Sequence, residues 1–137
     1  MRFVDTNILL YSLDLEPANA GKTAIATEIL TRSDLALSVQ VLQEFYVQAT
    51  HVRRPDALPH DIAARFIQKW LRFRIQETTV AVLQSALDLK DRYQISYWDA
   101  AILAAAKSAR CQQLLSEDLN HGQDYDGITV INPFLPS

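Results

Sequence analysis

Three aspartates that lie far apart in the sequence hold similar positions relative to apolar segments. Asp5 directly follows a short segment at the N-terminus that has β-forming character, and Asp118 follows the pair Leu114-Leu115. Asp99 lies in the first turn of an alanine-rich segment. Ligands of open α/β sheets bind beyond the carboxyl ends of the strands. If the segments before Asp5 and Asp118 are strands, we expect the three carboxylates to converge at one edge of a sheet.

Carboxylates that are packed together repel one another, so they either shift their pKa values or bind a counter-charge. A hard divalent cation such as Mg²⁺ or Mn²⁺ prefers oxygen ligands and supplies that counter-charge. A bound ion lowers the pKa of a water ligand and stabilises charge on a phosphate. Convergence of Asp5, Asp99 and Asp118 therefore predicts metal-assisted hydrolysis of a phosphodiester.

Each of these acids also has a local structural explanation. Asp5 could cap the helix that follows it or form a turn with its neighbours. Asp99 stands three residues after Ser96, as in a capping box with Asp in place of Glu. Asp118 and its neighbour Glu117 belong to a stretch rich in Asp, Asn and Gly, which is typical of turns. Spacing alone leaves both interpretations open.

A fourth acid, Glu44, lies beside Gln40 and Gln48 on one face of a predicted helix. The opposite face carries the apolar stripe Leu42, Phe45, Tyr46 and Ala49. A glutamate in this position is ordinarily solvated. Periodicity therefore does not single out Glu44.

The hydrophobic pattern predicts strands that alternate with helices. Strands are expected at 2–4, 35–38, 75–78, 114–115 and 128–131. Helices are expected at 8–13, 19–30, 39–51, 62–73, 80–93 and 97–109. Such alternation indicates a parallel sheet covered by helices on both faces. No repeat or linker interrupts the chain, so we expect a single domain over residues 1–137.

Two helices carry specific expectations about burial. The segment 97–109 is nearly apolar on every side, which is typical of a buried helix. In the segment 80–93, the apolar residues Val80, Leu83 and Leu87 stand at helical spacing and indicate its packed face.

Charge is distributed unevenly along the chain. The net charge of −3 argues against a general affinity for nucleic acid. Residues 53–74 are nevertheless basic, and residues 117–126 are acidic. One hypothesis is that four arginines of the basic stretch contact RNA phosphates, namely Arg53, Arg54, Arg72 and Arg74. The alternative is a solvated helical face.

The single cysteine, Cys111, excludes a disulfide within the chain and a zinc site built on cysteines. The N-terminus turns polar too early for a signal peptide. No apolar run approaches the roughly 20 residues that span a bilayer. We therefore expect a cytoplasmic protein without a membrane segment.

The acids fall within blocks that together resemble the PIN-domain family. The blocks are Phe3–Asn7, Ser38–Phe45, Tyr97–Ile102, Leu114–Leu119 and the ending Val130–Phe134. Each block is short, but their order and spacing extend over almost the whole chain. The size and spacing resemble VapC-type toxins of bacterial toxin–antitoxin pairs in particular.

This resemblance implies a Rossmann-like three-layer sandwich with a short parallel sheet, and an Mg²⁺- or Mn²⁺-dependent endoribonuclease. It implies an acidic pocket that is both catalytic and metal-binding, formed by Asp5, Glu44, Asp99 and Asp118, with Asp5 and Asp99 as the foremost metal ligands. Thr6, Asn7 and Ser116 would support these acids, and Glu117 is the alternative to Asp118. The family also implies a homodimer, an RNA substrate and a small antitoxin in the active-site groove.

Other functions fit the sequence less well. Within nucleases, the alternative is an enzyme of RNA processing or DNA metabolism, and the small size favours the toxin. A non-catalytic PIN-like binding module is disfavoured because all four acids are present. A phosphatase of the haloacid-dehalogenase type needs a second Asp two residues after its nucleophile, where this chain has Asn7. A receiver domain needs an acidic pair after the first strand and a phosphoacceptor on a middle strand, and we find neither.

Overall fold

The structure is a computed structural model of the chain, and it describes residues 1–136. A six-stranded sheet has the order β3-β2-β1-β4-β6-β5, in which every neighbouring pair is parallel except β5 and β6. The strands are β1 (Arg2–Val4), β2 (Leu35–Ser38), β3 (Arg74–Gln76), β4 (Gln113–Leu115), β5 (Asp124–Tyr125) and β6 (Ile128–Ile131).

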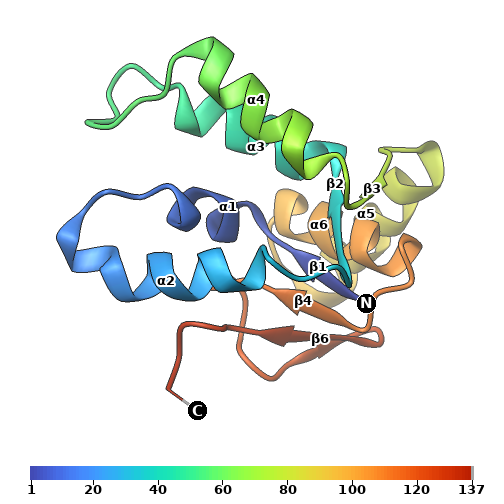
Figure 1. Ribbon diagram of the computed structural model, residues 1–137. Helices are drawn as coiled ribbons and strands as arrows, with labels where there is room; N and C mark the ends of the chain where they lie inside the picture. The colour runs from blue at the N-terminus through green and yellow to red at the C-terminus, as the bar shows by residue number, and fades with distance from the viewer. Residues whose placement is uncertain (137) are drawn as a thin grey trace.

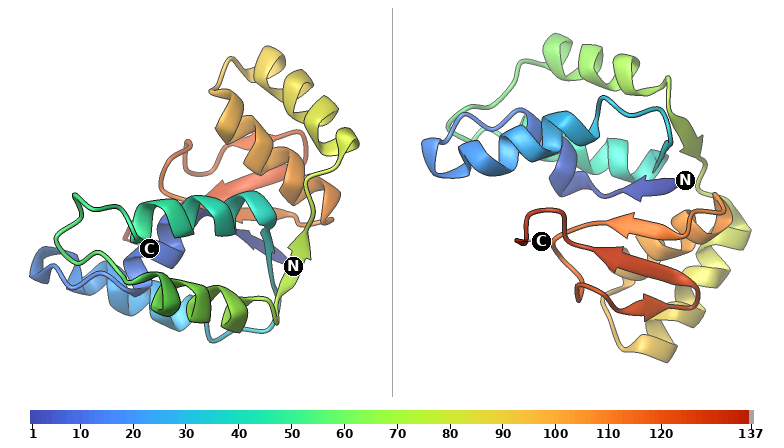
Figure 2. Two further views of the ribbon diagram at one scale, coloured as in Figure 1. Left: turned by 90° about the horizontal axis from the view of Figure 1, so that it is seen from above. Right: turned by 60° about the horizontal axis from the view of Figure 1, so that its bottom comes forward.

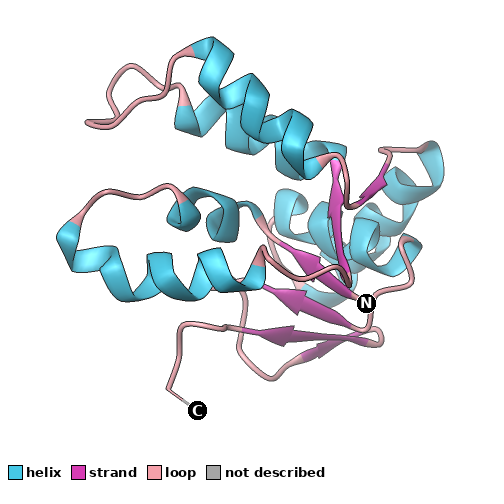
Figure 3. Ribbon diagram, in the orientation of Figure 1, coloured by secondary structure: helices cyan, strands magenta, loops and turns pink. Residues whose placement is uncertain are grey.

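Helices cover the sheet on both faces, which confirms the predicted three-layer architecture. Figures 1 and 2 place α5 and α6 on one face and α1 to α4 on the other, and Figure 3 shows the strands between them. The helices are α1 (Thr6–Ser12), η1 (Pro17–Asn19), α2 (Ala20–Ile29), α3 (Val39–Ala49), α4 (His60–Trp70), α5 (Val80–Tyr93) and α6 (Tyr97–Ser108).

The middle of the sheet is buried on both sides. All four residues of β2 are buried, as are Phe3 and Val4 of β1. Continuous apolar runs of this kind are typical of parallel strands between two helical layers. Seven consecutive residues of α6, 100–106, are also buried. The expected burial of this helix is confirmed, and its alanines allow it to approach β2, β3, β4 and β6 closely.

The expected packed face of α5 is wrong. Val80, Leu83 and Leu87 are 70%, 43% and 52% exposed. The helix instead buries the stripe Val82, Ala86 and Leu89, which has the same helical spacing and packs toward α6. Ala86, the small central residue of this stripe, permits close contact between α5 and α6.

The short strand β5 was not expected. It pairs antiparallel with β6 through a turn in which Asp126 and Gly127 both have positive φ, 55° and 94°. An Asp-Gly pair with this backbone is a strong signal of a β-hairpin. The strand β3 also begins one residue earlier and ends two residues earlier than predicted.

Candidate active site

The site lies where the strand order of the sheet reverses. Strands β2 and β3 follow β1 on one side, whereas β4 and β6 lie on the other. Val4 is in register with Leu115, so Asp5 and Ser116 are the first residues beyond the two central strands. The Asp5 N–H donates to the Leu115 carbonyl at 3.0 Å. Ligands of α/β sheets bind at this kind of switch point.

Asp5 is almost fully buried, with 5% of its surface exposed. Its Oδ1 accepts a 2.7 Å hydrogen bond from the Thr6 N–H, and its Oδ2 accepts one of 2.7 Å from Ser116 Oγ. Burial raises the pKa of Asp5 to about 7, the charges of Asp118 and Glu44 add to this rise, and the hydrogen bonds from Ser116 and Thr6 oppose it. Asp5 therefore caps α1, as one of the two interpretations of the sequence predicted. Its carboxyl group also lies at the switch point of the sheet.

Glu44 is not the solvated helical residue that its position suggests. It is half-buried in α3, where this helix contacts α1. Thr6 Oγ1 donates to its Oε2 at 3.2 Å, and Gln40 Nε2 donates to its Oε1 at 2.7 Å. The first residue of α1 thus holds Glu44 toward Asp5.

The loop after β4 brings Asp118 to the same place. Asn7 Nδ2 donates to Asp118 Oδ2 at 3.1 Å and to Ser116 Oγ at 3.4 Å. The Asp118 N–H donates to Ser116 Oγ at 3.1 Å. Burial raises the pKa of Asp118, as do the charges of Asp99 and Glu117, whereas the Asn7 donor lowers it. Ser116 therefore links both aspartates and Asn7.

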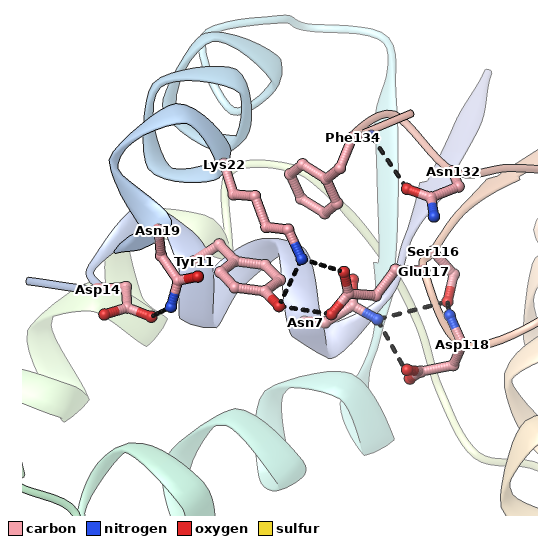
Figure 4. A network of polar contacts seen from close by, with 10 residues as sticks. All are labelled: Asn7, Tyr11, Asp14, Asn19, Lys22, Ser116, Glu117, Asp118, Asn132 and Phe134. Carbon is pink, nitrogen blue, oxygen red and sulfur yellow. Dashed lines mark hydrogen bonds and ion pairs between the residues drawn. The ribbon is translucent and has the colours of Figure 1, made fainter. Parts of the chain in front are cut away.

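Glu117 takes part in a different cluster, which Figure 4 shows. Tyr11 Oη donates to Glu117 Oε1 at 2.6 Å, and Lys22 Nζ donates to Glu117 Oε2 at 3.0 Å. Lys22 also lies over the rings of Tyr11 and Phe134. The carboxylate of Glu117 is thus paired with a cation, while that of Asp118 is held by Asn7.

A cavity of about 200 Å³ brings the four predicted acids together. Its lining residues are Asp5, Thr6, Asn7, Leu10, Glu44, Gln48, Trp98, Asp99, Ile102 and Asp118. We call it the acidic pocket. Ser96 Oγ accepts from the Asp99 N–H at 3.1 Å, so the capping interpretation holds for Ser96 while the Asp99 side chain lines the pocket. Glu117 is not part of this lining.

The donor types of the pocket fit a hard divalent cation. Four carboxylates share a small cavity, and the buried Asn7 Oδ1 has no hydrogen-bond partner among residues 1–136. Oxygen donors of this kind are the ligands of Mg²⁺ and Mn²⁺. Over the same residues, no three His, Cys, Asp or Glu side chains are arranged to hold an ion as they stand. The carboxylates instead accept hydrogen bonds from Ser116, Thr6 and Asn7.

The four arginines of the basic stretch do not line the acidic pocket. Arg54 pairs with Asp56 at 2.9 Å, and Arg72 donates to the Leu30 carbonyl at 2.7 Å. Arg53 and Arg74 are exposed. Two of the four guanidinium groups thus have structural contacts of their own.

The lining also contains four residues that were not predicted from the sequence, Leu10, Gln48, Trp98 and Ile102. Trp98 is the most informative of them, because 64% of this large apolar side chain is exposed. Its position directly before Asp99 is the signal that could have identified it.

The fold and the pocket define a class of protein: a Rossmann-like α/β domain with an acidic pocket at the switch point of its sheet. The sequence profile of the PIN domain matches residues 2–123, and the chain belongs to the PIN-domain family. No curated protein sequence matches the chain. Among residues 1–136, no helix combines the length and hydropathy required to cross a membrane.

Several solved structures share the fold. A toxin–antitoxin complex from Klebsiella pneumoniae contains a chain with 21% identity and a TM-score of 0.70, covering 97% of this chain and 98% of that one. A FitAB complex bound to DNA contains one with 18% identity and a TM-score of 0.76, covering 100% and 98%. Mycobacterium tuberculosis VapC20, described as a sarcin-ricin loop cleaving toxin, has 19% identity and a TM-score of 0.67, covering 86% and 90%. At these identities the likeness establishes the fold alone.

Proposed function

We propose that this protein is a divalent-metal-dependent endoribonuclease and the toxin of a type II toxin–antitoxin pair. The observation that carries the proposal is the gathering of Asp5, Glu44, Asp99 and Asp118 around one pocket at the sheet's switch point. Membership of the PIN-domain family supports it. So does the shared fold with chains of toxin–antitoxin complexes, and with a toxin described as cleaving the sarcin-ricin loop.

In this proposal Asp5 and Asp99 are the principal ligands of Mg²⁺ or Mn²⁺, and Glu44 and Asp118 complete the acidic set. The bound ion supplies a water of lowered pKa and stabilises negative charge at the scissile phosphate. Asp5, whose pKa is raised to about 7, loses its proton when the cation binds.

The polar neighbours position these acids. Thr6 holds Glu44 through its hydroxyl, and Ser116 holds Asp5. Asn7 holds Asp118 through its Nδ2, and its buried Oδ1 accepts no hydrogen bond from residues 1–136. A carboxylate that is misplaced binds the ion more weakly. These three residues therefore set the positions of the acids rather than react themselves.

We propose a cytoplasmic homodimer that a cognate antitoxin inhibits. A chain of a toxin–antitoxin complex and a chain of the FitAB complex with DNA share the fold of this protein. This likeness supports an antitoxin as its partner.

The test is cleavage of purified RNA by the purified protein with Mg²⁺, Mn²⁺ or a chelator. Asp99→Asn should abolish cleavage, because one ligand carboxylate is lost while side-chain size is kept. Asp88→Asn is the matched control, since Asp88 is an exposed residue of α5 outside the pocket. Thermal melting should show that both variants are folded. Metal-dependent cleavage by Asp99→Asn at the wild-type rate would remove the catalytic assignment.

A further inference from the structure

A second cavity adjoins the acidic pocket on the surface of α3. It has a volume of about 470 Å³ and is lined by Gln40, Gln43, Glu44, Val47, Gln48 and Trp98. We call it the Trp98 groove. Glu44, Gln48 and Trp98 line both cavities, so the groove continues directly from the pocket.

The groove contains two exposed apolar residues that are not packed in the core. Trp98 is 64% exposed and Val47 is 61% exposed, whereas the other tryptophan, Trp70, is 3% exposed in the core. An indole at the mouth of a pocket offers a flat surface on which a planar ring can stack.

Most of the polar side chains that line the groove are uncharged amides, those of Gln40, Gln43 and Gln48. Gln40 Nε2 is bound to Glu44, but within residues 1–136 no hydrogen bond engages the side-chain amides of Gln43 and Gln48. An amide offers both donors and an acceptor, which suits the edges of a nucleobase. Glu44 is the only charged residue of the lining, and it is negative. The groove therefore suits an uncharged ring and disfavours a phosphate.

We propose that the Trp98 groove binds an unpaired nucleobase of the RNA, stacked on the indole beside the scissile phosphate. The inference rests on the proposed nuclease function and adds to it a subsite for the base next to the cleaved bond. Proteins read unpaired bases by stacking and by hydrogen bonds to their edges. Trp98 is thus a substrate-binding residue of this subsite.

The test is steady-state cleavage of a single-stranded RNA by Trp98→Ala, Trp98→Phe and wild type. Stacking contributes alike to the bound substrate and to the transition state, so its loss raises KM and leaves kcat unchanged. We expect Trp98→Ala to raise KM by about tenfold, and Trp98→Phe to restore most of the loss because it keeps an aromatic face. Leu15→Ala, at an 80% exposed apolar residue outside the groove, is the control.

A titration that follows tryptophan fluorescence adds a direct readout. The Asp99→Asn protein, which should leave RNA uncut, is mixed with an oligoribonucleotide of about 12 nucleotides or with a sugar–phosphate oligomer of that length without bases. Stacking on exposed Trp98 should quench its emission with the RNA but not with the baseless oligomer. Buried Trp70 should supply the signal that stays constant.

The outcomes separate the two proposals. Wild-type KM and kcat in Trp98→Ala, beside an inactive Asp99→Asn, overturn the base site and leave the nuclease in place. Equal quenching by the baseless oligomer also overturns the base site. If Trp98→Ala changes inhibition by the antitoxin but not RNA cleavage, the groove holds a protein segment and the proposal is wrong. If the wild-type protein cleaves no RNA, the proposed function fails and the inference fails with it.

Discussion

Asp5 is the residue whose environment departs most from that of an exposed carboxylate. Its pKa is raised from 3.8 to about 7, chiefly because it is buried. The folded state therefore holds this proton more tightly than the unfolded state does. The resulting stabilisation is complete below pH 3.8 and is lost as the pH rises toward 7.

This shift predicts a pH-dependent stability in metal-free protein. Between pH 5 and pH 8 in a chelator, ionisation of Asp5 should lower the free energy of unfolding by about 2–3 kcal/mol. Asp5→Asn cannot ionise, so the variant should lose that part of the decrease. Urea denaturation of both proteins at the two pH values measures the difference. An equal decrease of the free energy of unfolding in wild type and variant would show that ionisation of Asp5 does not cause it.

Ser116 also sets the environment of Asp5. Its hydroxyl is fully buried and donates to Asp5 Oδ2. Ser116→Ala should raise the pKa of Asp5 further and destabilise the fold by about 1–3 kcal/mol, because it leaves Asn7 and Asp118 short of an acceptor. The acid limb of the pH–rate profile for RNA cleavage should therefore move to higher pH. Ser116→Thr, which keeps the hydroxyl, should return the limb toward its wild-type position, and failure to do so would contradict the role.

The sequence was informative about these residues only up to a point. Asp5, Asp99 and Asp118 could be singled out because each stands beside a predicted strand end or helix start. Glu44 could not be singled out in this way. The hydrophobic periodicity of α3 indicates its packed face, but it does not indicate that Thr6 from a distant segment contacts Glu44. The choice between Glu117 and Asp118 was open for a similar reason, since Lys22 and Tyr11 pair with one of them across the fold.

Among the elements, strands were easier to predict than helix faces. Strands β1, β2, β4 and β6 are parallel and largely buried, so they appear as short apolar runs between polar residues. The helix α5 carries two apolar stripes, and its packing against α6 decides which is buried. The strand β5 was missed because two residues carry no periodicity.

The two stripes of α5 give a prediction for that element. Leu89 is 3% exposed and Leu87 is 52% exposed. Leu89→Ala should lower the free energy of unfolding by about 2–4 kcal/mol, because it leaves a cavity against the core. Leu87→Ala should cost less than about 1 kcal/mol. Chemical denaturation of the two variants measures both values, and the opposite order would contradict the observed orientation of α5.

Across the whole molecule, one cluster connects the pocket to distant parts of the chain. Lys22 of α2 pairs with Glu117 in the loop after β4, and Phe134 near the C-terminus packs edge-on against Tyr11 of α1 at 5.0 Å. The loop that carries Ser116 and Asp118 is thereby tied to three other segments.

This cluster predicts a long-range effect on the pocket. Lys22→Met should leave the charge of Glu117 uncompensated, and this charge raises the pKa of Asp118. The pH at which RNA cleavage reaches half its maximum should therefore rise, while the free energy of unfolding changes little because the ion pair is partly exposed. Lys22→Arg, or the double variant Lys22→Met and Glu117→Gln, should restore the profile. An unchanged profile in Lys22→Met would show that Glu117 does not affect the pocket.

The most direct test of the shared acidic pocket is calorimetric titration of Mn²⁺ into the purified protein at a pH above 7. We expect wild type and the control Asp88→Asn to bind the ion with the same affinity. Asp5→Asn and Asp99→Asn, which remove carboxylates from distant parts of the chain, should each weaken binding by at least about tenfold, as losses of ligand-shell groups do. Wild-type affinity in both variants would mean that the two aspartates hold no common ion.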